Sequence, residues 1–231
     1  MNIETHFDKV CHFHIQCGIT IPTTEQRDLF IRDPNLINKA VGFIEEEYKE
    51  YLDAIEKDDE CEKLDALIDI SYFTLRLCAL LGSNMDDKKF KHVEWRGIYV
   101  DVIGKKCVDV IKDLLDDIVQ QVKNENYDAL IHALYNMEII VEKIGIQRLN
   151  HQFKKWYEAF DLIHQNNMSK LCQNEAEAID TVTSYEGHSI YKHVAYRQAP
   201  DQQHWVVYDQ DTGKILKSNL WKPVDLTLFF K

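Results

Sequence analysis

Two adjacent segments, about 36–57 and 60–81, carry the pattern that most constrains the fold. Apolar residues recur in both at spacings of three and four, which predicts two helices. Only the short connection Lys57–Asp59 separates them, so we expect an antiparallel helical hairpin. The second segment is apolar most of the way round, which predicts a helix that is buried on most sides.

Acidic residues interrupt this apolar pattern on the second helix. Glu62, Asp65 and Asp69 fall on one narrow stripe at helical spacing, and Tyr72 and Arg76 continue it. Because the rest of the helix is apolar, we expect the stripe to point into the structure.

The first helix has acids of its own. Its apolar face is formed by residues such as Ile44 and Tyr48, and three glutamates lie on the opposite side: Glu46, Glu47 and Glu50. Glu47 and Glu50 share their stripe with Phe43 and Ala54. By contrast, the segment 97–123 separates its apolar residues from its aspartates and lysines, which is typical of an amphipathic helix with one wet face.

The six acids of the hairpin are therefore expected to face one another across the two helices. Carboxylates packed so closely repel each other, and some would have to take up protons unless cations neutralise them. Hard divalent cations such as Mg²⁺ or Mn²⁺ prefer oxygen ligands and resolve this conflict. A di-iron site is disfavoured, because no glutamate in the chain is followed three residues later by a histidine.

The remaining sequence predicts more helices and then a small sheet. We expect helices near 1–18, 126–145, 151–165 and 169–184, and a loop with a short helical turn between Thr20 and Pro34. From Glu186 the sequence alternates, is rich in aromatic and β-branched residues, and contains a "DTG" turn, which predicts an antiparallel β meander. We find no internal repeat.

The predicted architecture is mainly α: a helical bundle with a small C-terminal antiparallel β meander. We expect an α-helical domain over 1–185, with a helical insertion at about 86–150, and a β appendage over 186–231. Four prolines and eight glycines among 231 residues fit long helices better than a turn-rich β fold.

Composition limits the classes of function and location. A net charge of −12 disfavours nucleic-acid binding, which needs a basic surface. The six cysteines are irregularly spaced and no signal peptide precedes them, which predicts reduced thiols in a cytoplasmic protein. No apolar run approaches the roughly 20 residues that cross a bilayer, so no membrane partner is expected.

Four strings together resemble a known superfamily. "EEYKE" (46–50) followed by "EKLD" (62–65) resembles the paired EExxE and ExxD motifs of the all-α nucleoside triphosphate pyrophosphohydrolases. This superfamily includes MazG-like, phosphoribosyl-ATP pyrophosphohydrolase-like and dimeric dUTPase branches. "CHFHIQCGI" (11–19) resembles its N-terminal helix, and "FDLIHQNNMSKL" (160–171) resembles a segment of the phosphoribosyl-ATP branch. The tail from Tyr196 resembles the C-terminal extension of that branch, whereas 86–150 is longer than in simple family members.

The resemblance implies a Mg²⁺-dependent hydrolase, with Mn²⁺ as a substitute, that cleaves a nucleoside triphosphate between the α and β phosphates. It implies two or three ions held by five acids: Glu46, Glu47, Glu50, Glu62 and Asp65. Glu47 or Glu50 would act on the attacking water. Asp69 would support the ligands or be a further ligand, and Arg76 would pair with the acidic stripe or bind the triphosphate. Four further residues would contact the substrate: His14, Tyr72, Asn167 and Lys170. Phe13 would line the base pocket beside His14.

Several alternatives stay open. The substrate is alternatively dUTP or a phosphoribosyl nucleotide, and the chain is alternatively a non-catalytic helical module that binds metal or a partner protein. His14 with Cys11 and Cys17 is a weak zinc candidate, since the string shows no tetrahedral closure. Tyr72 suits the core as well as a nucleoside contact. We expect a homodimer, or a tetramer, because a hairpin that is apolar on both sides needs partners beyond its own chain.

Overall fold

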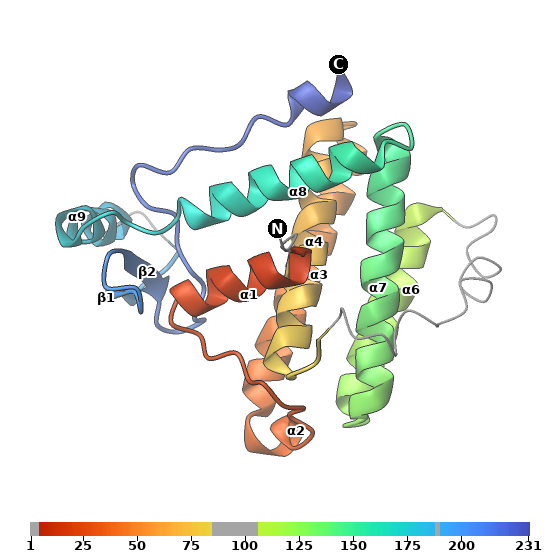
Figure 1. Ribbon diagram of the computed structural model, residues 1–231, viewed down its shortest axis with the longest axis horizontal. Coiled ribbons are helices and arrows are strands. Elements are labelled where there is room, and N and C mark those ends of the chain that lie inside the picture. Colours follow the sequence, from red (N-terminus) through yellow and green to blue (C-terminus); the bar gives the residue numbers. More distant parts are fainter. Residues whose placement is uncertain (1–4, 85–105, 188–189) are drawn as a thin grey trace. The chain divides into compact units, whose positions relative to one another are not determined.

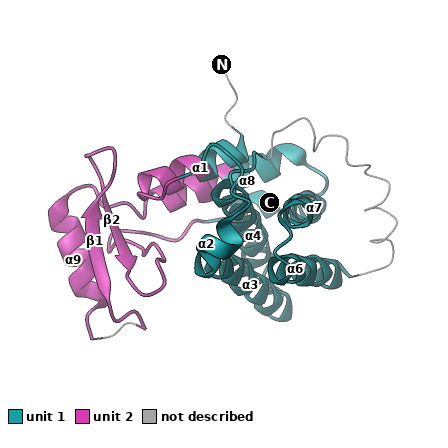
Figure 2. Ribbon diagram, turned by 90° about the horizontal axis from the view of Figure 1, so that it is seen from below, with its two compact units in different colours: residues 1–10, 21–160, 225–231 teal, residues 11–20, 161–224 magenta. Residues whose placement is uncertain are grey.

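The structure is a computed structural model that describes residues 5–84, 106–187 and 190–231. It divides the chain into two compact units (Figure 2). Unit 1 comprises residues 1–10, 21–160 and 225–231, and unit 2 comprises residues 11–20 and 161–224. Each unit is therefore assembled from segments that lie far apart in the sequence.

Four long helices build the centre of unit 1 (Figure 1). They are α3 (Pro34–Glu56), α4 (Glu60–Leu80), α6 (Cys107–Lys123) and α7 (Tyr127–Arg148). Helices α3 and α4 form the predicted hairpin, and α6 and α7 form a second one. Helix α4 packs against α7, and α3 packs against α6, so the two hairpins close a four-helix bundle (Figure 2).

Local signals explain where the first hairpin begins and turns. The carboxylate of Asp33 accepts a hydrogen bond from the Leu36 amide, and Pro34 occupies the first helical turn of α3. The carboxylate of Asp59 accepts hydrogen bonds from the amides of Cys61 and Glu62 at the start of α4. Between the helices Asp58 adopts a left-handed backbone conformation, with φ of 53°.

The core of the bundle is centred on α4. Its side chains are buried on nearly every side, and Leu64, Leu67 and Ile68 are 0% exposed. The prediction of an almost wholly buried helix is therefore confirmed. However, α7 of the same chain packs on α4, which removes the physical reason for expecting a second chain there.

The remaining α-helices of the described residues are α1 (His6–Gln16), α2 (Leu29–Arg32), α8 (Phe153–Met168) and α9 (Glu175–Tyr185). In unit 1 the His6 ring stacks on Phe160 at a centroid distance of 3.7 Å. Also in unit 1, Trp156 of α8 lies against Gly145 of α7, and a Cβ built on this glycine would come within 2.0 Å of the indole. Only a glycine at this position allows α7 and α8 to approach so closely.

Unit 2 contains the small sheet. Strand β1 (Val194–Gln198) pairs antiparallel with β2 (Trp205–Asp209), with Val194 opposite Asp209 and Gln198 opposite Trp205. One core joins the sheet to α9: Val207, Ala178, Cys172 and Leu216 are buried together. This shared core explains why α9 belongs with the sheet, whereas the sequence suggested a boundary after residue 185.

The predicted fold class, a mainly α chain with a small antiparallel β element, is confirmed. Helix α6 begins at Cys107 rather than near residue 97, and residues 97–105 of that prediction lie outside the described part of the chain. All six cysteines are free thiols. Among the described residues no helix is long and apolar enough to cross a membrane.

Candidate functional site

The predicted metal-binding acids lie on the two helices of the first hairpin. Glu46, Glu47 and Glu50 are on α3, and their exposure differs: Glu47 is buried at 7%, Glu46 is half-buried and Glu50 is exposed. The exposed Glu50 and the buried Glu47 are thus one helical turn apart on α3.

The stripe on α4 runs from solvent into the bundle. Glu62 is exposed at the start of the helix, and Asp65 and Asp69 are half-buried. The stripe ends at Tyr72 and Arg76, which are 2% and 8% exposed. The prediction of an inward-facing stripe therefore holds for its second half, while its first acid remains accessible to a ligand in solution.

A cation lies at the buried end of this stripe. The guanidinium carbon of Arg76 sits 4.9 Å from the ring centroid of Phe43. Phe43 stacks on Phe73 at 5.2 Å, and it is one helical turn before Glu47. Arg76 therefore brings positive charge close to the part of α3 that carries the glutamates, as a partner of acidic groups would.

Tyr72 belongs to the core of unit 1. It is 2% exposed and its ring stacks on Phe160, with a centroid distance of 5.7 Å. Of the two alternatives that the sequence left for Tyr72, this packing favours the core.

The donor set on the hairpin is chemically suited to Mg²⁺ or Mn²⁺, because it consists of carboxylates only. Among the described residues, however, no three His, Cys, Asp or Glu side chains converge closely enough to form a metal-binding group. This holds for the acids of the hairpin and for Cys11, His14 and Cys17 alike. The structure thus puts the six acids of the hairpin on the adjoining helices α3 and α4.

The other predicted substrate residues lie in unit 2. His14 and Asn167 are 4% and 7% exposed, and Lys170 is half-buried. The rings of His12 and His164 are 6.5 Å apart, so the C-terminal halves of α1 and α8 adjoin within this unit. Phe13 is also buried and meets the His14 ring edge-on at 5.2 Å.

One residue of the "NNMSK" string, Asn166, has a structural role that the sequence did not predict. The side-chain amide of Asn166 donates to the Lys222 carbonyl at 2.7 Å, and its oxygen accepts from the Trp221 indole at 3.0 Å. The Ser169 hydroxyl donates to the Asn166 carbonyl at 2.7 Å. Asn166 therefore holds the C-terminal segment, and nothing in the local sequence distinguishes it from Asn167.

A polar network fixes the turn side of the first hairpin. The Lys63 ammonium donates to Asp58 and Glu60 at 2.6 and 2.7 Å, and Arg148 donates to Glu60 at 3.0 Å. The Tyr51 hydroxyl accepts from Arg148 at 3.0 Å. Burial raises the pKa of Tyr51, so the phenol stays neutral in this network.

A titratable group outside the predicted stripe lies at the interface of α4 and α7. The Ser71 hydroxyl donates to Oε1 of Glu138 at 2.9 Å. Within the described residues the other oxygen of Glu138 is buried without a hydrogen-bond partner. Burial of the carboxyl group raises the pKa of Glu138 to about 8, so this glutamate is mostly neutral at pH 7.

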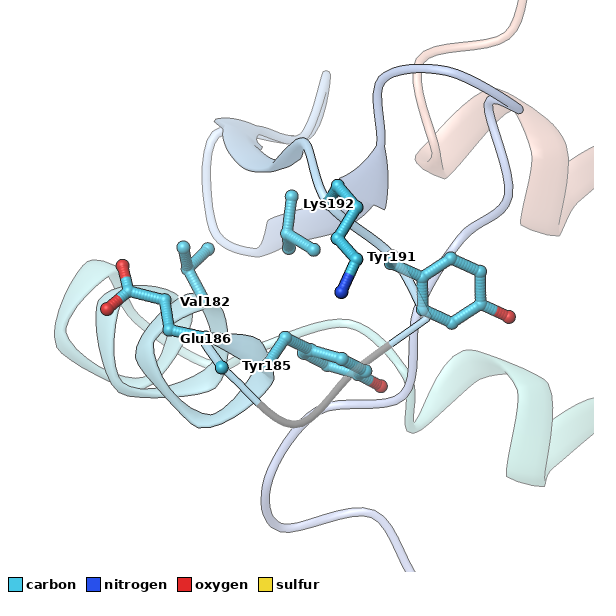
Figure 3. Close-up of a pocket in the computed structure, with 7 residues that line it drawn as sticks. Val182, Tyr185, Glu186, Tyr191 and Lys192 are labelled. Carbon is cyan, nitrogen blue, oxygen red and sulfur yellow. The ribbon is translucent and has the colours of Figure 1, made fainter.

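Unit 2 contains a pocket of about 210 Å³ between α9 and β1 (Figure 3). The rings of Tyr185 and Tyr191 and the aliphatic chain of Lys192 border it. Its volume is below the roughly 300 Å³ at which pockets for small-molecule ligands begin. None of the predicted substrate residues lines it, so it does not serve as the candidate site.

The first hairpin matches a known protein family. Residues 22–94 match the model of the family described as "Phosphoribosyl-ATP pyrophosphohydrolase", and this range contains all of α3 and α4. The chain belongs to the all-α nucleoside triphosphate pyrophosphohydrolase superfamily. The matched range contains every predicted metal ligand and ends before α6, so the second hairpin lies outside it.

The chain is also similar over nearly its whole length to "Uncharacterized protein L479" of Acanthamoeba polyphaga mimivirus. The two are 30% identical over 238 residues, which cover 94% of this chain and 92% of the viral protein. This similarity extends through both units, so it covers the sequence of the second hairpin and of the sheet region as well. No solved structure matches the chain significantly.

Proposed function

We propose that this superfamily member is a Mg²⁺-dependent nucleotide pyrophosphohydrolase, which converts a nucleoside triphosphate to the monophosphate and pyrophosphate. One observation carries the proposal: six acids occupy the packed helices α3 and α4 inside the family-matched range, and one of them, Glu47, is buried. A buried carboxylate is costly unless a cation, a proton or hydrogen bonds offset its charge.

In this proposal five acids hold the ions: Glu46, Glu47, Glu50, Glu62 and Asp65. Bound Mg²⁺ or Mn²⁺ ions would neutralise the triphosphate, polarise the α-phosphorus and lower the pKa of a bound water. Asp69 would orient the ligands as a hydrogen-bonding neighbour. Arg76 would balance the remaining negative charge at the buried end of the stripe.

The proton of the attacking water needs an acceptor. Glu47 suits this role because it is shielded from bulk water, and Glu50 is the alternative at the exposed rim. Asn167 and Lys170 would bind phosphate or sugar, with the lysine acting as a point charge. His14 would contact the base beside Phe13.

Product analysis tests the reaction. The protein would be incubated with Mg²⁺ and a panel of nucleoside triphosphates that includes dUTP and phosphoribosyl-ATP. We expect a monophosphate and pyrophosphate, and we expect their formation to stop when the metal is chelated. Orthophosphate as the first product would contradict cleavage between the α and β phosphates.

The phosphoribosyl nucleotide is the second candidate substrate, because the matched family model carries its name. If it alone in the panel is hydrolysed, this narrower assignment replaces the general one. No turnover with any compound, together with retained metal binding, would favour the non-catalytic module.

A matched pair of variants tests the site. Glu50→Ala should lower turnover on the order of 100-fold or more, because it removes a metal ligand. Glu56→Ala removes an exposed glutamate from the last turn of the same helix and should leave turnover unchanged. Equal activities of the two variants would show that the acids of α3 do not hold the ions.

A further inference from the structure

The two hairpins of the bundle share one turn geometry. In the first, Asp58 has φ of 53°, and its amide donates to the Ile55 carbonyl at 3.2 Å. In the second, Glu125 also has φ of 53°, and its amide donates to the Val122 carbonyl at 3.0 Å. Adding 67 to a residue number of the first hairpin gives its counterpart in the second, and this is also the separation of Ser71 and Glu138.

The residues around the two turns agree with this register. The amide of Asp59 donates to Ala54 at 3.0 Å, and that of its counterpart Asn126 donates to Gln121 at 3.1 Å. Asp59 and Asn126 also cap the helices that follow, α4 and α7, with their side-chain oxygens. The ends of α3 and α6 and the starts of α4 and α7 thus coincide under one shift.

The contacts between the hairpins have the pattern that a twofold axis produces. Across such an axis, a residue on the axis meets its own counterpart, and every other contact occurs twice with the partners exchanged. Ser71 hydrogen-bonds to its counterpart Glu138 at 2.9 Å. Glu60 accepts from Arg148 at 3.0 Å, and the counterparts of these two residues, Tyr127 and Leu81, are joined by a 3.0 Å hydrogen bond.

Apolar positions are retained under the same register. Identical pairs occur on both helices of the hairpin, and buried positions of α4 recur as buried positions of α7. The identical pairs are Val41 and Val108, Ile44 and Ile111, Ala66 and Ala133, and Leu67 and Leu134.

The acid set is not retained. Counterparts of the six acids include two aspartates, but the others are a leucine, an alanine, a histidine and an asparagine. In the order of Glu46, Glu47, Glu50, Glu62, Asp65 and Asp69 they are Asp113, Leu114, Asp117, Ala129, His132 and Asn136. The counterpart of the buried Glu47 is therefore apolar, so the second hairpin lacks the acid that the first one turns inward.

We propose that α6–α7 is a degenerate counterpart of the metal-binding hairpin α3–α4. It closes the bundle where a second copy of α3–α4 would otherwise pack. The catalytic unit is then complete in one chain, and each chain has a single metal–phosphate site, on α3–α4. The chemistry of that site rests on the proposed function, whereas the pairing of the hairpins rests on the contacts above.

A counterpart pair of variants tests this inference. Glu50 and Asp117 are counterparts on the two hairpins. Glu50 is exposed, and Asp117 is half-buried. Binding of Mn²⁺ would be measured by equilibrium dialysis without nucleotide, and the molar mass of the same samples by light scattering. We expect Glu50→Ala to weaken Mn²⁺ binding at least 10-fold and Asp117→Ala to change it less than twofold. We expect the wild type to bind Mn²⁺ fully while its molar mass is that of a 27.2 kDa monomer.

Two results would overturn the inference. One is an equal loss of Mn²⁺ binding in both variants, which would mean that both hairpins hold metal. The other is Mn²⁺ binding that disappears as a dimer dissociates on dilution. If no triphosphate is hydrolysed but Mn²⁺ binding is lost only in Glu50→Ala, the proposed function fails and the pairing of an active with a degenerate hairpin stands.

Discussion

The two hairpins of the bundle share a turn geometry and differ in their chemistry. Both place a residue with φ of 53° between two long helices, and both begin the next helix with a side-chain cap. Only α3–α4 carries the full acid stripe, and only this hairpin lies in the range matched by the family model. The comparison teaches that turn chemistry and apolar spacing suffice to build the hairpin, so the residues of the stripe can change without loss of the fold.

The largest effect should come from the glycines, which the two hairpins use differently. A Cβ at Gly145 of α7 would lie 2.0 Å from Trp156, whereas one at Gly42 of α3 would meet nothing within 4 Å. We expect Gly145→Ala to lower the free energy of unfolding by about 3 kcal/mol through overpacking. Gly42→Ala should raise it by about 0.5–1 kcal/mol, because alanine favours the helix.

Urea denaturation of both variants measures these changes. A small effect of Gly145→Ala would mean that α7 and α8 move apart at little cost. The close packing of these helices would then contribute little to stability.

The second effect concerns Glu138 of the second hairpin. Its counterpart in the first hairpin is Ser71, which does not ionise. The ordinary pKa of 4.5 applies to the unfolded chain, and folding raises it to about 8. Between these values the folded chain holds a proton that the unfolded chain lacks, so the free energy of unfolding falls as the pH rises. Above about pH 8 this contribution is constant.

Glu138→Gln should remove this dependence and stabilise the protein by about 3 kcal/mol at pH 7, since the amide oxygen still accepts from Ser71. Denaturation at pH 5.5, 7 and 8.5 checks it. If the wild type and the variant have parallel pH profiles, the carboxyl of Glu138 is ionised in the folded bundle.

The third effect should be equal in the two hairpins. Asp59→Ala and Asn126→Ala each remove the side-chain cap at the start of a helix. Each should cost about 1 kcal/mol of stability. Thermal unfolding compares them directly, and a much larger loss for one would show that the turns are not equivalent in energy.

The smallest effect concerns the left-handed residues themselves. Glu125→Gly should stabilise the protein by about 0.5 kcal/mol, because glycine adopts positive φ without steric cost. Asp58→Gly should gain less, since it also removes the 2.6 Å contact between Asp58 and Lys63. Equal shifts of the denaturation midpoint would mean that this contact contributes nothing measurable.

Much of the bundle follows from the sequence because its signals are local. The spacing of apolar residues predicted α3 at 36–57 and α4 at 60–81, and the structure has Pro34–Glu56 and Glu60–Leu80. Asp33 and Asp59 explain the starts, because each caps its helix with a side-chain oxygen. The acids of the site are visible in the sequence for the same reason, since their stripe needs only helical geometry.

What depends on distant residues could not be predicted. The hairpins share few identical residues, so the repeat is recognisable only from turn geometry and from contacts such as Ser71 with Glu138. The grouping of residues 11–20 with 161–224 depends on pairings across most of the chain. Glu47 and Glu50 look alike in sequence, and only packing makes one buried and the other exposed.

One contact of unit 2 has a consequence for the order in which the chain folds. The Arg197 guanidinium donates to the Cys17 carbonyl at 2.7 Å and lies 4.2 Å from the ring centroid of Tyr208. It therefore closes the end of α1 just before Gly18, across 180 residues of sequence. During synthesis the end of α1 leaves the ribosome long before Arg197, so it must wait without this partner while the four-helix bundle forms. A chain that ends at residue 160 should consequently contain a protease-resistant bundle and a cleavable segment at 11–20.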